Sequence, residues 1–205
     1  MNIAAIVQQR PADNRRWLVP SLPLSTDRLL LAQPGPDDAS RLLSYAVENR
    51  DFLAPWEMSR SDRYFTLEYW EEQVSVKRDQ IQAGAIAHFL LFDKSEPAGP
   101  LVGQCALSEI VRGPFQAAYL GYSLDRQAYG KGLMHEALTA VIEYAFDELK
   151  LHRLMANYMP TNERSGRVLR RLGFSVEGYA RDYLKIAGRW EDHILTALTN
   201  PSGEP

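Results

Sequence analysis

The stretch AYGKGLMHEAL, residues 128–138, places two glycines directly before an apolar-periodic segment. Glycine weakens a helix, so Gly130 and Gly132 at its mouth need another explanation. Two interpretations are open. The glycines shape a surface turn, or they let unpaired backbone N–H groups approach a negatively charged group. A helix N-terminus favours the second through its dipole. The stretch by itself leaves both interpretations open.

The residues after the two glycines carry the strongest helix signal in the chain, over 133–149. Apolar residues recur there at spacings of one, three and four, as in a helix that packs on a sheet. This stripe consists of Met134, Ala137, Leu138, Val141, Ile142, Ala145 and Leu149. Upstream, three apolar segments separated by short turns predict an antiparallel meander. These expected strands are residues 85–93, 101–111 and 117–124.

Two helices are expected before the meander. The first begins at Asp37 or Asp38, since either carboxylate can act as an N-cap. Pro55 breaks helical structure, so residues 49–57 are expected to form a loop. The other elements expected in this part are a strand at 28–33 and a helix at 66–83 that Thr66 caps.

The segment after the long helix predicts a strand, a helix and a closing hairpin. Residues 152–159 form a strand that Pro160 stops, and the helix over 163–172 ends at Gly173, a suitable C-cap. The closing elements are a short strand at 174–177 and a hairpin that turns at residues 187–188. This order predicts an α+β (mixed α/β) fold with helices on both faces of one sheet.

Length and composition fit one domain. The chain has 205 residues, 45% of them hydrophobic, and a net charge of -3. Residues 1–21 show no clear period and are interpreted as a loose N-terminal arm, while residues 22–201 form a single domain. A mildly acidic chain argues against a dedicated nucleic-acid site, and no apolar run is long enough for a membrane span. The single cysteine, Cys105, suggests a reducing compartment, with the cytoplasm as the default.

Known phosphate and metal motifs do not fit the chain. A Walker A loop would need glycine where Asp125 stands, and the dinucleotide fingerprint fails at His135. The four histidines lack metal-ligand spacing, so no metal is expected. A strand, a loop with two glycines and a long helix remain, which is enough to present unpaired N–H groups to a pyrophosphate.

Neighbouring segments decide between the two interpretations. YLGYSL (119–124), YGKGLM (129–134), MPTNERSGRVLRRLGF (159–174) and EGYARDYL (177–184) together resemble the GNAT superfamily of acetyl-CoA-dependent N-acetyltransferases. The resemblance is greatest to the RimJ type, the ribosomal-protein-alanine N-acetyltransferases, and covers residues 25–201. The family loop reads Gln/Arg-x-x-Gly-x-Gly/Ala. With Gly132 aligned to the first glycine of this pattern, the chain has Tyr129 in place of Gln/Arg and Met134 in place of the final small residue.

The resemblance implies a GNAT fold, in which a mostly antiparallel sheet splays apart at the cofactor site. Acetyl-CoA would bind there, its pantetheine arm pairing with the exposed edge of the strand that ends at Leu124. The implied binding residues are Tyr122, Ser123, Leu124, Gly130, Lys131, Gly132, Leu133, Met134, His135 and Asn162. Asn162 also suits a helix N-cap, and both roles stay open. Gly121 fits either a bulge that opens the gap or a packing glycine.

The resemblance also implies catalytic roles. The Leu124 N–H would stabilise the oxyanion, and Ser165 would deliver a proton to the leaving thiolate, because Leu169 replaces the tyrosine that related enzymes often use. Many relatives carry a glutamate where this chain has Asn157, so the base is unassigned. Glu57 and Glu109 are candidates for the base, although solvated surface charges would look the same.

Apolar residues without periodicity would form the wall of the substrate mouth, unless they seal the core instead. The candidate substrate-binding residues are Asn49, Phe52, Trp56 and Tyr183. The implied acceptor is the N-terminal alanine of a small-subunit ribosomal protein, with the ribosomal subunit as a further expected partner. Two alternatives stay open. One is an acetyltransferase for another protein N-terminus, a small amine or an aminoglycoside, and the other is a non-catalytic coenzyme A-binding module on the ribosome.

Overall fold

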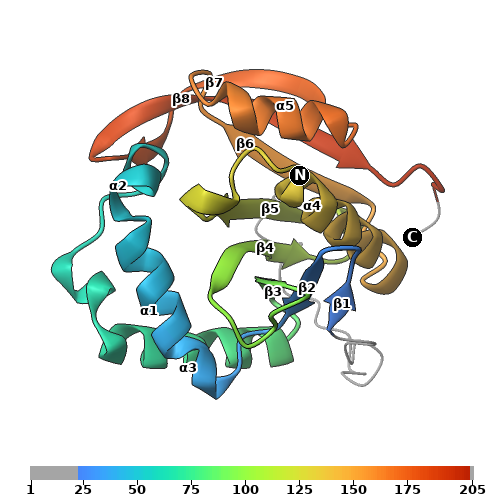
Figure 1. The fold of residues 1–205 in the computed structure, drawn as a ribbon. Helices are drawn as coiled ribbons and strands as arrows, with labels where there is room; N and C mark the ends of the chain where they lie inside the picture. The colour runs from blue at the N-terminus through green and yellow to red at the C-terminus, as the bar shows by residue number, and fades with distance from the viewer. Residues whose placement is uncertain (1–22, 204–205) are drawn as a thin grey trace.

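The computed structural model describes residues 23–203, which contain one eight-stranded sheet. The strand order is β1-β2-β3-β4-β5-β6-β8-β7 (Figure 1). The strands are β1 (Leu24–Ser25), β2 (Leu29–Ala32), β3 (Ala87–Asp93), β4 (Leu101–Val111), β5 (Ala117–Leu124), β6 (Arg153–Tyr158), β7 (Ser175–Ile186) and β8 (Arg189–Thr199). The arm expected over residues 1–21 lies outside the described residues, so this division of the chain stays a prediction.

Five α-helices and several short helices connect the strands within residues 23–203. The α-helices are α1 (Ala39–Glu48), α2 (Arg50–Leu53), α3 (Leu67–Gln82), α4 (Leu133–Glu143) and α5 (Glu163–Arg171). The 3-10 helices are η2 (Pro36–Asp38), η3 (Ala54–Trp56), η4 (Asp62–Phe65) and η5 (Arg126–Ala128), and α4 continues into a π-helical turn, η6 (Tyr144–Glu148). The expected α+β class is confirmed, as are Thr66 as the cap of α3 and the left-handed Gly173 after α5.

The sheet is antiparallel except at one place. Only β5 and β6 run parallel, and they pair through residues 117–119 and 153–155. Beyond Tyr119 and Met155 the two strands no longer pair with each other, although β5 continues to Leu124 and β6 to Tyr158. The expected splay of a mostly antiparallel sheet is therefore confirmed, and it leaves one edge of β5 unpaired.

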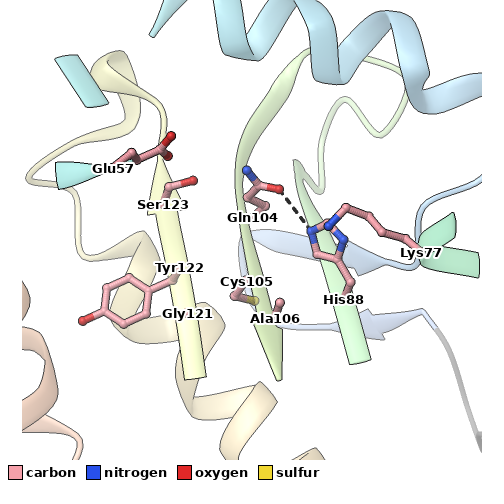
Figure 2. A pocket seen from close by; sticks show the side chains of 9 residues that line it. All are labelled: Glu57, Lys77, His88, Gln104, Cys105, Ala106, Gly121, Tyr122 and Ser123. Carbon is pink, nitrogen blue, oxygen red and sulfur yellow. Dashed lines mark hydrogen bonds between the residues drawn. The ribbon is translucent and has the colours of Figure 1, made fainter. Parts of the chain in front are cut away.

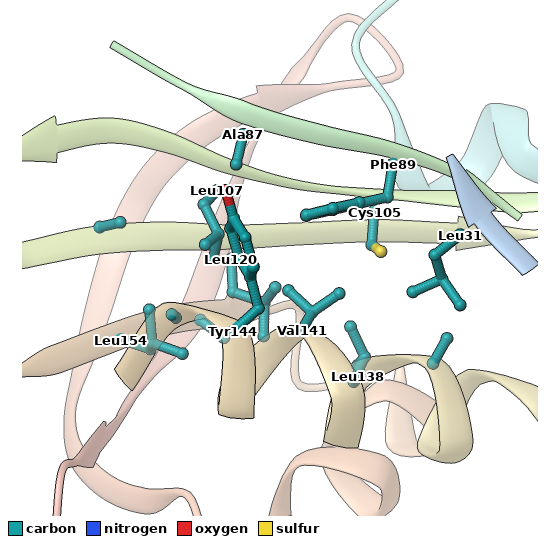
Figure 3. Close-up of a cluster of buried hydrophobic side chains, with 14 of the residues drawn as sticks. Leu31, Ala87, Phe89, Cys105, Leu107, Leu120, Leu138, Val141, Tyr144 and Leu154 are labelled. Atoms are coloured by element: carbon teal, nitrogen blue, oxygen red, sulfur yellow. The ribbon is translucent and has the colours of Figure 1, made fainter. Parts of the chain in front are cut away.

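Helices cover both faces of the sheet, as expected (Figure 1). On β3, Phe89 and Leu91 point into a core with α4, whereas Leu90 and Phe92 pack against α1 and α3. This alternation follows from the two-residue period of a strand. Figure 3 shows the α4 core, in which Leu138 and other residues of the predicted stripe face β2 to β5. Each fully buried leucine of this kind contributes about 2 kcal/mol to folding.

Two local expectations are wrong, and of the two open interpretations of Gly121 the bulge is excluded. Pro55 does not leave a loop, because residues 50–56 form α2 and η3, with Pro55 in the first turn, where a missing N–H costs nothing. The Asp38 carboxylate does not cap α1; it accepts the Gly35 N–H at 2.8 Å. Gly121 pairs in register with Ala106, and the bulge lies in β4 between Ser108 and Val111.

The C-terminal elements also differ in detail from the expectation. The short strand at 174–177 and the first arm of the hairpin merge into one strand, β7, which has register shifts after Val176 and after Ala180. The turn between β7 and β8 is at Ala187 and Gly188, as predicted. Through β8, the hairpin pairs with the whole length of β6, on the edge of that strand opposite β5.

Candidate active site

The loop before α4 presents a row of free backbone donors. Gly130 and Gly132 both adopt left-handed conformations, with φ of 77° and 78°. Within residues 23–203, no acceptor pairs with the backbone N–H groups of residues 130–135, and the first ladder bond of α4 is Glu136 N–H to Gly132 C=O. These donors lie at the positive end of the α4 dipole. The bend can therefore hold an anion without losing any internal hydrogen bond.

The two left-handed glycines correct the expected register of the family pattern. They stand three and five residues after Gln127, so Gln127, Gly130 and Gly132 meet the pattern Gln/Arg-x-x-Gly-x-Gly/Ala at all three positions. The alignment on Gly132, which made Tyr129 and Met134 departures, is wrong. Met134 is 7% exposed and belongs to the core, so only its backbone faces the bend.

An ion pair between Arg28 and Glu136 holds this loop in place. The Arg28 guanidinium binds the Glu136 carboxylate at 2.6 Å and donates from Nη1 to the Lys131 carbonyl at 3.0 Å. Glu136 also accepts the Thr26 hydroxyl at 2.6 Å. Partial burial would raise the pKa of Glu136, but the hydrogen bonds from Thr26 and Arg28 hold it below its usual value. Sequence reasoning missed Arg28, because the contact joins residues 108 positions apart.

The unpaired edge of β5 presents alternate residues to the gap that opens between β5 and β6 beyond Tyr119. In an antiparallel ladder, hydrogen-bonded pairs alternate with pairs that are not hydrogen-bonded. Because Asp125 N–H donates to Val102 C=O, Ser123 and Gln104 form the next hydrogen-bonded pair. The backbone groups of Tyr122 and Leu124 therefore face the gap. Those of Ser123 face β4, so the expected backbone contact of Ser123 with pantetheine is wrong.

A hydroxyl pair spans the gap from β5 to α5. The Tyr122 phenol and the Ser165 hydroxyl are 2.7 Å apart. Burial raises the pKa of Tyr122 to about 12, so this phenol stays protonated and can act as a hydrogen-bond donor. Asn162 is the N-cap of α5, where its side chain accepts the Ser165 N–H at 3.2 Å. Gly166 lets α5 approach the sheet, since a Cβ there would lie 2.7 Å from the Tyr158 ring.

Tyr129 joins three elements at the mouth of the gap. Its ring meets Phe52 of α2 edge-on, with centroids 5.7 Å apart. On α5, the Arg164 guanidinium lies 4.4 Å from the centroid of the same ring. Phe52 is half-buried in this contact, and it is therefore placed beside the glycine loop.

A cavity of about 200 Å³ opens on the other face of the sheet, between β3 to β5 and the helices α1 and α3. Figure 2 shows Glu57 and Ser123 at one end of it and Lys77 with His88 at the other. Gly121 contributes no side chain, so the cavity reaches the β5 backbone opposite the gap. The Ser123 hydroxyl accepts the Tyr45 phenol at 3.0 Å. A molecule in this cavity can thus approach β5 from the side opposite the α4 core.

Two basic groups at the inner end of the cavity are perturbed by burial. Burial, together with the nearby Lys77 charge, lowers the pKa of His88 to about 3, so the imidazole is neutral. Burial, and then the Arg60 charge, lowers the pKa of Lys77. His88 is 2% exposed and its Nε2 lies 3.1 Å from Gln104 Oε1. Sequence reasoning missed both residues, since nothing in α3 or β3 signals a shared cavity.

The four residues expected to line the substrate site do not lie together. Asn49 lines a second cavity of about 270 Å³, which Glu57 also lines. Asn49 is 1% exposed, and its amide bonds Asp125 and the Arg126 N–H, so it ties α1 to η5. Trp56 is 37% exposed and lines neither cavity. Tyr183 accepts a hydrogen bond from the Asn157 amide at 3.2 Å, on the β6 side of the gap.

The two candidate bases are far from equivalent. The Glu57 carboxylate faces the first cavity, and its Oε2 accepts the Arg60 guanidinium at 3.0 Å. The Glu57 carbonyl accepts the Ala187 N–H, which anchors this loop to the β7–β8 turn. Glu109 is exposed in the β4 bulge with φ of 50°. The position facing the cavity makes Glu57 the candidate that the geometry favours.

Other chemistries find little support. Across residues 23–203 no group of three or more His, Cys, Asp or Glu side chains could hold a metal ion. The same part of the chain holds no helix long and apolar enough to cross a bilayer. Cys105 is buried, and burial raises the pKa of its thiol, which suits a core residue and not a nucleophile.

Comparisons with known proteins agree with this geometry. The family described as acetyltransferase (GNAT) domain matches residues 28–175. The ribosomal protein uS5-alanine N-acetyltransferase of Escherichia coli (strain K12) is 47% identical over 187 residues, which are 91% of this chain and 95% of the relative. The ribosomal-protein-S5-alanine acetyltransferase from Vibrio fischeri superposes with a TM-score of 0.85 at 38% identity, covering 90% of this chain and 100% of that one. Mycobacterium smegmatis RimJ in complex with CoA-disulfide superposes with a TM-score of 0.80 at 25% identity, covering 89% and 90%.

Proposed function

Since the chain belongs to the GNAT family of acetyltransferases, we propose that it transfers the acetyl group of acetyl-CoA to the N-terminal alanine of a small-subunit ribosomal protein. The observation that carries the donor assignment is the row of unpaired N–H groups over residues 130–135, beside an unpaired edge of β5. The acceptor is supported by the 47% identity to an enzyme named for ribosomal protein uS5-alanine. The cytoplasm, where ribosomes act, is the compartment that fits.

The residues of the loop fit the diphosphate of coenzyme A. Backbone donors of residues 130–135 bind its oxygens, the exposed Lys131 adds a positive charge, and the two glycines leave the approach open. The side chain of Glu136, which would repel the diphosphate, is neutralised by Arg28. The rest of the donor chain, a series of amides, pairs with the backbone of Tyr122 and Leu124 along the β5 edge. The Asn162 amide has an N–H donor left for the same arm, since its oxygen caps α5.

The acceptor amine reaches the thioester from the cavity side. Acetyl-CoA supplies an activated acetyl group, and the amine nitrogen bonds to its carbonyl carbon as the C–S bond breaks. A free α-amino group has a pKa of roughly 8, so about a tenth is neutral at pH 7 and a carboxylate suffices to accept its proton. Glu57 serves as that base, directly or through water, because its carboxylate faces the cavity. The Leu124 N–H, which the register of β4 and β5 directs toward the gap, stabilises the carbonyl oxygen.

The leaving thiolate takes its proton from the hydroxyl pair. Ser165 lies on the first turn of α5 and faces the gap through its contact with Tyr122. Either hydroxyl of this pair can be the donor; with Tyr122 as donor, the serine hydroxyl is directed toward the gap, gives its proton to the thiolate sulfur and takes the phenolic proton of Tyr122 in its place. Ser165 thus occupies the role that a tyrosine at position 169 would otherwise fill, while Leu169 belongs to the core.

Thiol release in the presence of acetyl-CoA tests the proposal. Peptides beginning with Ala, Ser or Met, the intact ribosomal protein and a panel of small amines are offered as acceptors. Release with Ala peptides and with the ribosomal protein is the expected result. Release only with small amines or an aminoglycoside would replace the acceptor, and tight acetyl-CoA binding without any release would favour a non-catalytic module on the ribosome. Comparing the free ribosomal protein with the assembled subunit tests the further partner.

A further inference from the structure

Polar side chains form a row across three strands on the floor of the first cavity. Ser123 of β5 lies opposite Gln104 of β4. Two residues further along β4, Ala106 lies opposite His88 of β3. All three polar side chains face α1 and α3, because they occupy alternate positions of their strands. Neighbouring strands lie about 4.8 Å apart, so the row extends roughly 10 Å from β5 inward.

The inner end of this row has hydrogen-bonding capacity that the protein does not use. His88 is 2% exposed, yet its Nδ1 has no partner among the described residues. Gln104 contacts His88 through its oxygen, which leaves its amide N–H groups directed into the cavity (Figure 2). Lys77 lies over His88, and no carboxylate in residues 23–203 is within ion-pair distance of its ammonium. A half-buried cation without a counter-charge is unfavourable unless a ligand supplies one.

The charges of the cavity are arranged as two opposite ends. Glu57 lies at the end beside Ser123 and is already paired with Arg60, so it does not neutralise Lys77. Lys77 offers ammonium donors and Gln104 offers amide donors, while His88 is neutral and can accept a hydrogen from Lys77. This donor set fits the two oxygens of a carboxylate. A neutral amide in the same place would leave the ammonium charge uncompensated.

We propose that Lys77, His88 and Gln104 form a specificity subsite that binds an acidic side chain of the acceptor, close to its N-terminus. This inference rests on the proposed function, because it places the acceptor amine at the β5 edge. An extended peptide advances about 3.3 Å per residue, so the 10 Å row corresponds to roughly three residues. A Glu or Asp at position two, three or four of the acceptor therefore reaches the subsite. The 200 Å³ cavity holds the side chain and a short stretch of backbone and excludes a folded acceptor.

Paired peptides test the subsite. Each begins with Ala and carries Glu at position two, three or four, and its partner carries Gln at the same place. The wild-type kcat/KM is expected to favour one Glu peptide over its Gln partner by about tenfold, as one charge-assisted contact provides. In Lys77→Met the Glu-to-Gln ratio falls to about one. Arg78→Met removes the neighbouring, exposed charge of α3 and keeps the wild-type ratio.

A charge exchange separates recognition from damage to the fold. Lys77→Glu is expected to reverse the preference, so that a peptide with Lys at the selected position is acetylated faster than the Glu peptide. Acetylation of all Ala peptides without any Glu preference at positions two to four would overturn the subsite and leave the proposed function intact. A Glu preference that survives in Lys77→Met would overturn it as well. Failure to acetylate any Ala peptide, with acetyl-CoA still bound, would overturn the proposed function and the subsite together.

Discussion

The unpaired edge of β5 and its cavity face present polar groups from different parts of the chain. On the gap side, the donors are backbone N–H groups from one stretch of the chain, those of Tyr122, Leu124 and residues 130–135. On the cavity side, the functional groups are side chains from five separate elements or loops. These are Glu57, Lys77, His88, Gln104 and Ser123. A backbone site depends on local conformation, and so on glycine, whereas a side-chain site depends on the packing that brings distant residues together.

The largest effect is expected where a side chain is forced into the backbone site. Gly132→Asp places a carboxylate at φ of 78° among the donors meant for a diphosphate. Repulsion and lost access should raise the Kd for acetyl-CoA about 1000-fold, which corresponds to about 4 kcal/mol of lost binding free energy. Titration calorimetry measures this. Gly113→Asp is the matched control, since Gly113 has φ of 72° and open space around it in the β4–β5 turn.

The control separates the two explanations of the glycine loop. Both variants suffer the strain of a non-glycine residue in the left-handed region, so both should lose similar stability in a thermal melt. Only Gly132→Asp should lose affinity. Equal acetyl-CoA affinity in Gly132→Asp and the wild type would mean that the glycines only shape a turn.

The contrast between the faces also explains what the sequence could predict. The strands at 101–111 and 117–124 were predicted to the residue, because apolar segments bounded by short turns are local signals. The glycine loop was predictable for the same reason, and only its register was misread. The cavity was not predictable, since Lys77 and His88 come together only when α3 packs on β3. Of its residues, Glu57 alone was proposed for catalysis, and there as one of two equal candidates.

The wrong local predictions were made from residue type alone. Pro55 was interpreted as a helix breaker, and Gly121 as a bulge former or a packing glycine. Proline in the first turn of η3 loses no hydrogen bond, and the bulge of the β4–β5 ladder lies at Glu109, which takes up a φ of 50°. Arg28 was missed because its partners, Glu136 and the Lys131 carbonyl, lie more than a hundred residues away.

Ser165→Ala tests whether the gap side also needs a side chain. Loss of the proton donor should lower kcat about 100-fold with little change in KM, the usual scale of general acid catalysis. Tyr122→Phe keeps Ser165 and removes only its 2.7 Å partner, so its kcat should lie between those of Ser165→Ala and the wild type. Steady-state kinetics with a saturating Ala peptide give both values. A wild-type kcat in Ser165→Ala would remove the serine from the mechanism and leave a site made of backbone alone.

His88→Gln tests the cost of burying side chains on the cavity side. The folded pKa of His88 is about 3, against about 6.5 when unfolded. Between pH 3 and pH 6.5 the unfolded chain binds a proton at His88 that the folded chain does not bind. The free energy of unfolding is therefore highest above pH 6.5 and falls as the pH drops toward 3. Between pH 7 and pH 5 the wild type should lose about 2 kcal/mol more than His88→Gln in urea unfolding. Exposed His152→Gln is the control, and an unchanged loss in His88→Gln would contradict the buried neutral imidazole.

Glu57→Gln should have the smallest effect, because part of the acceptor amine is already deprotonated and needs no base. With about a tenth of the amine neutral at pH 7, complete base assistance gains about tenfold in kcat/KM for an Ala peptide. At pH 9, where most of the amine is already neutral, the deficit should shrink toward twofold or less. Acetyl-CoA affinity should not change, since Glu57 lies on the cavity side of β5. Glu109→Gln, at the exposed bulge, should match the wild type at both pH values. A deficit that stays the same at pH 9, or that appears equally in Glu109→Gln, would show that the cavity orients the amine without taking its proton, and the cavity side would then act by binding alone.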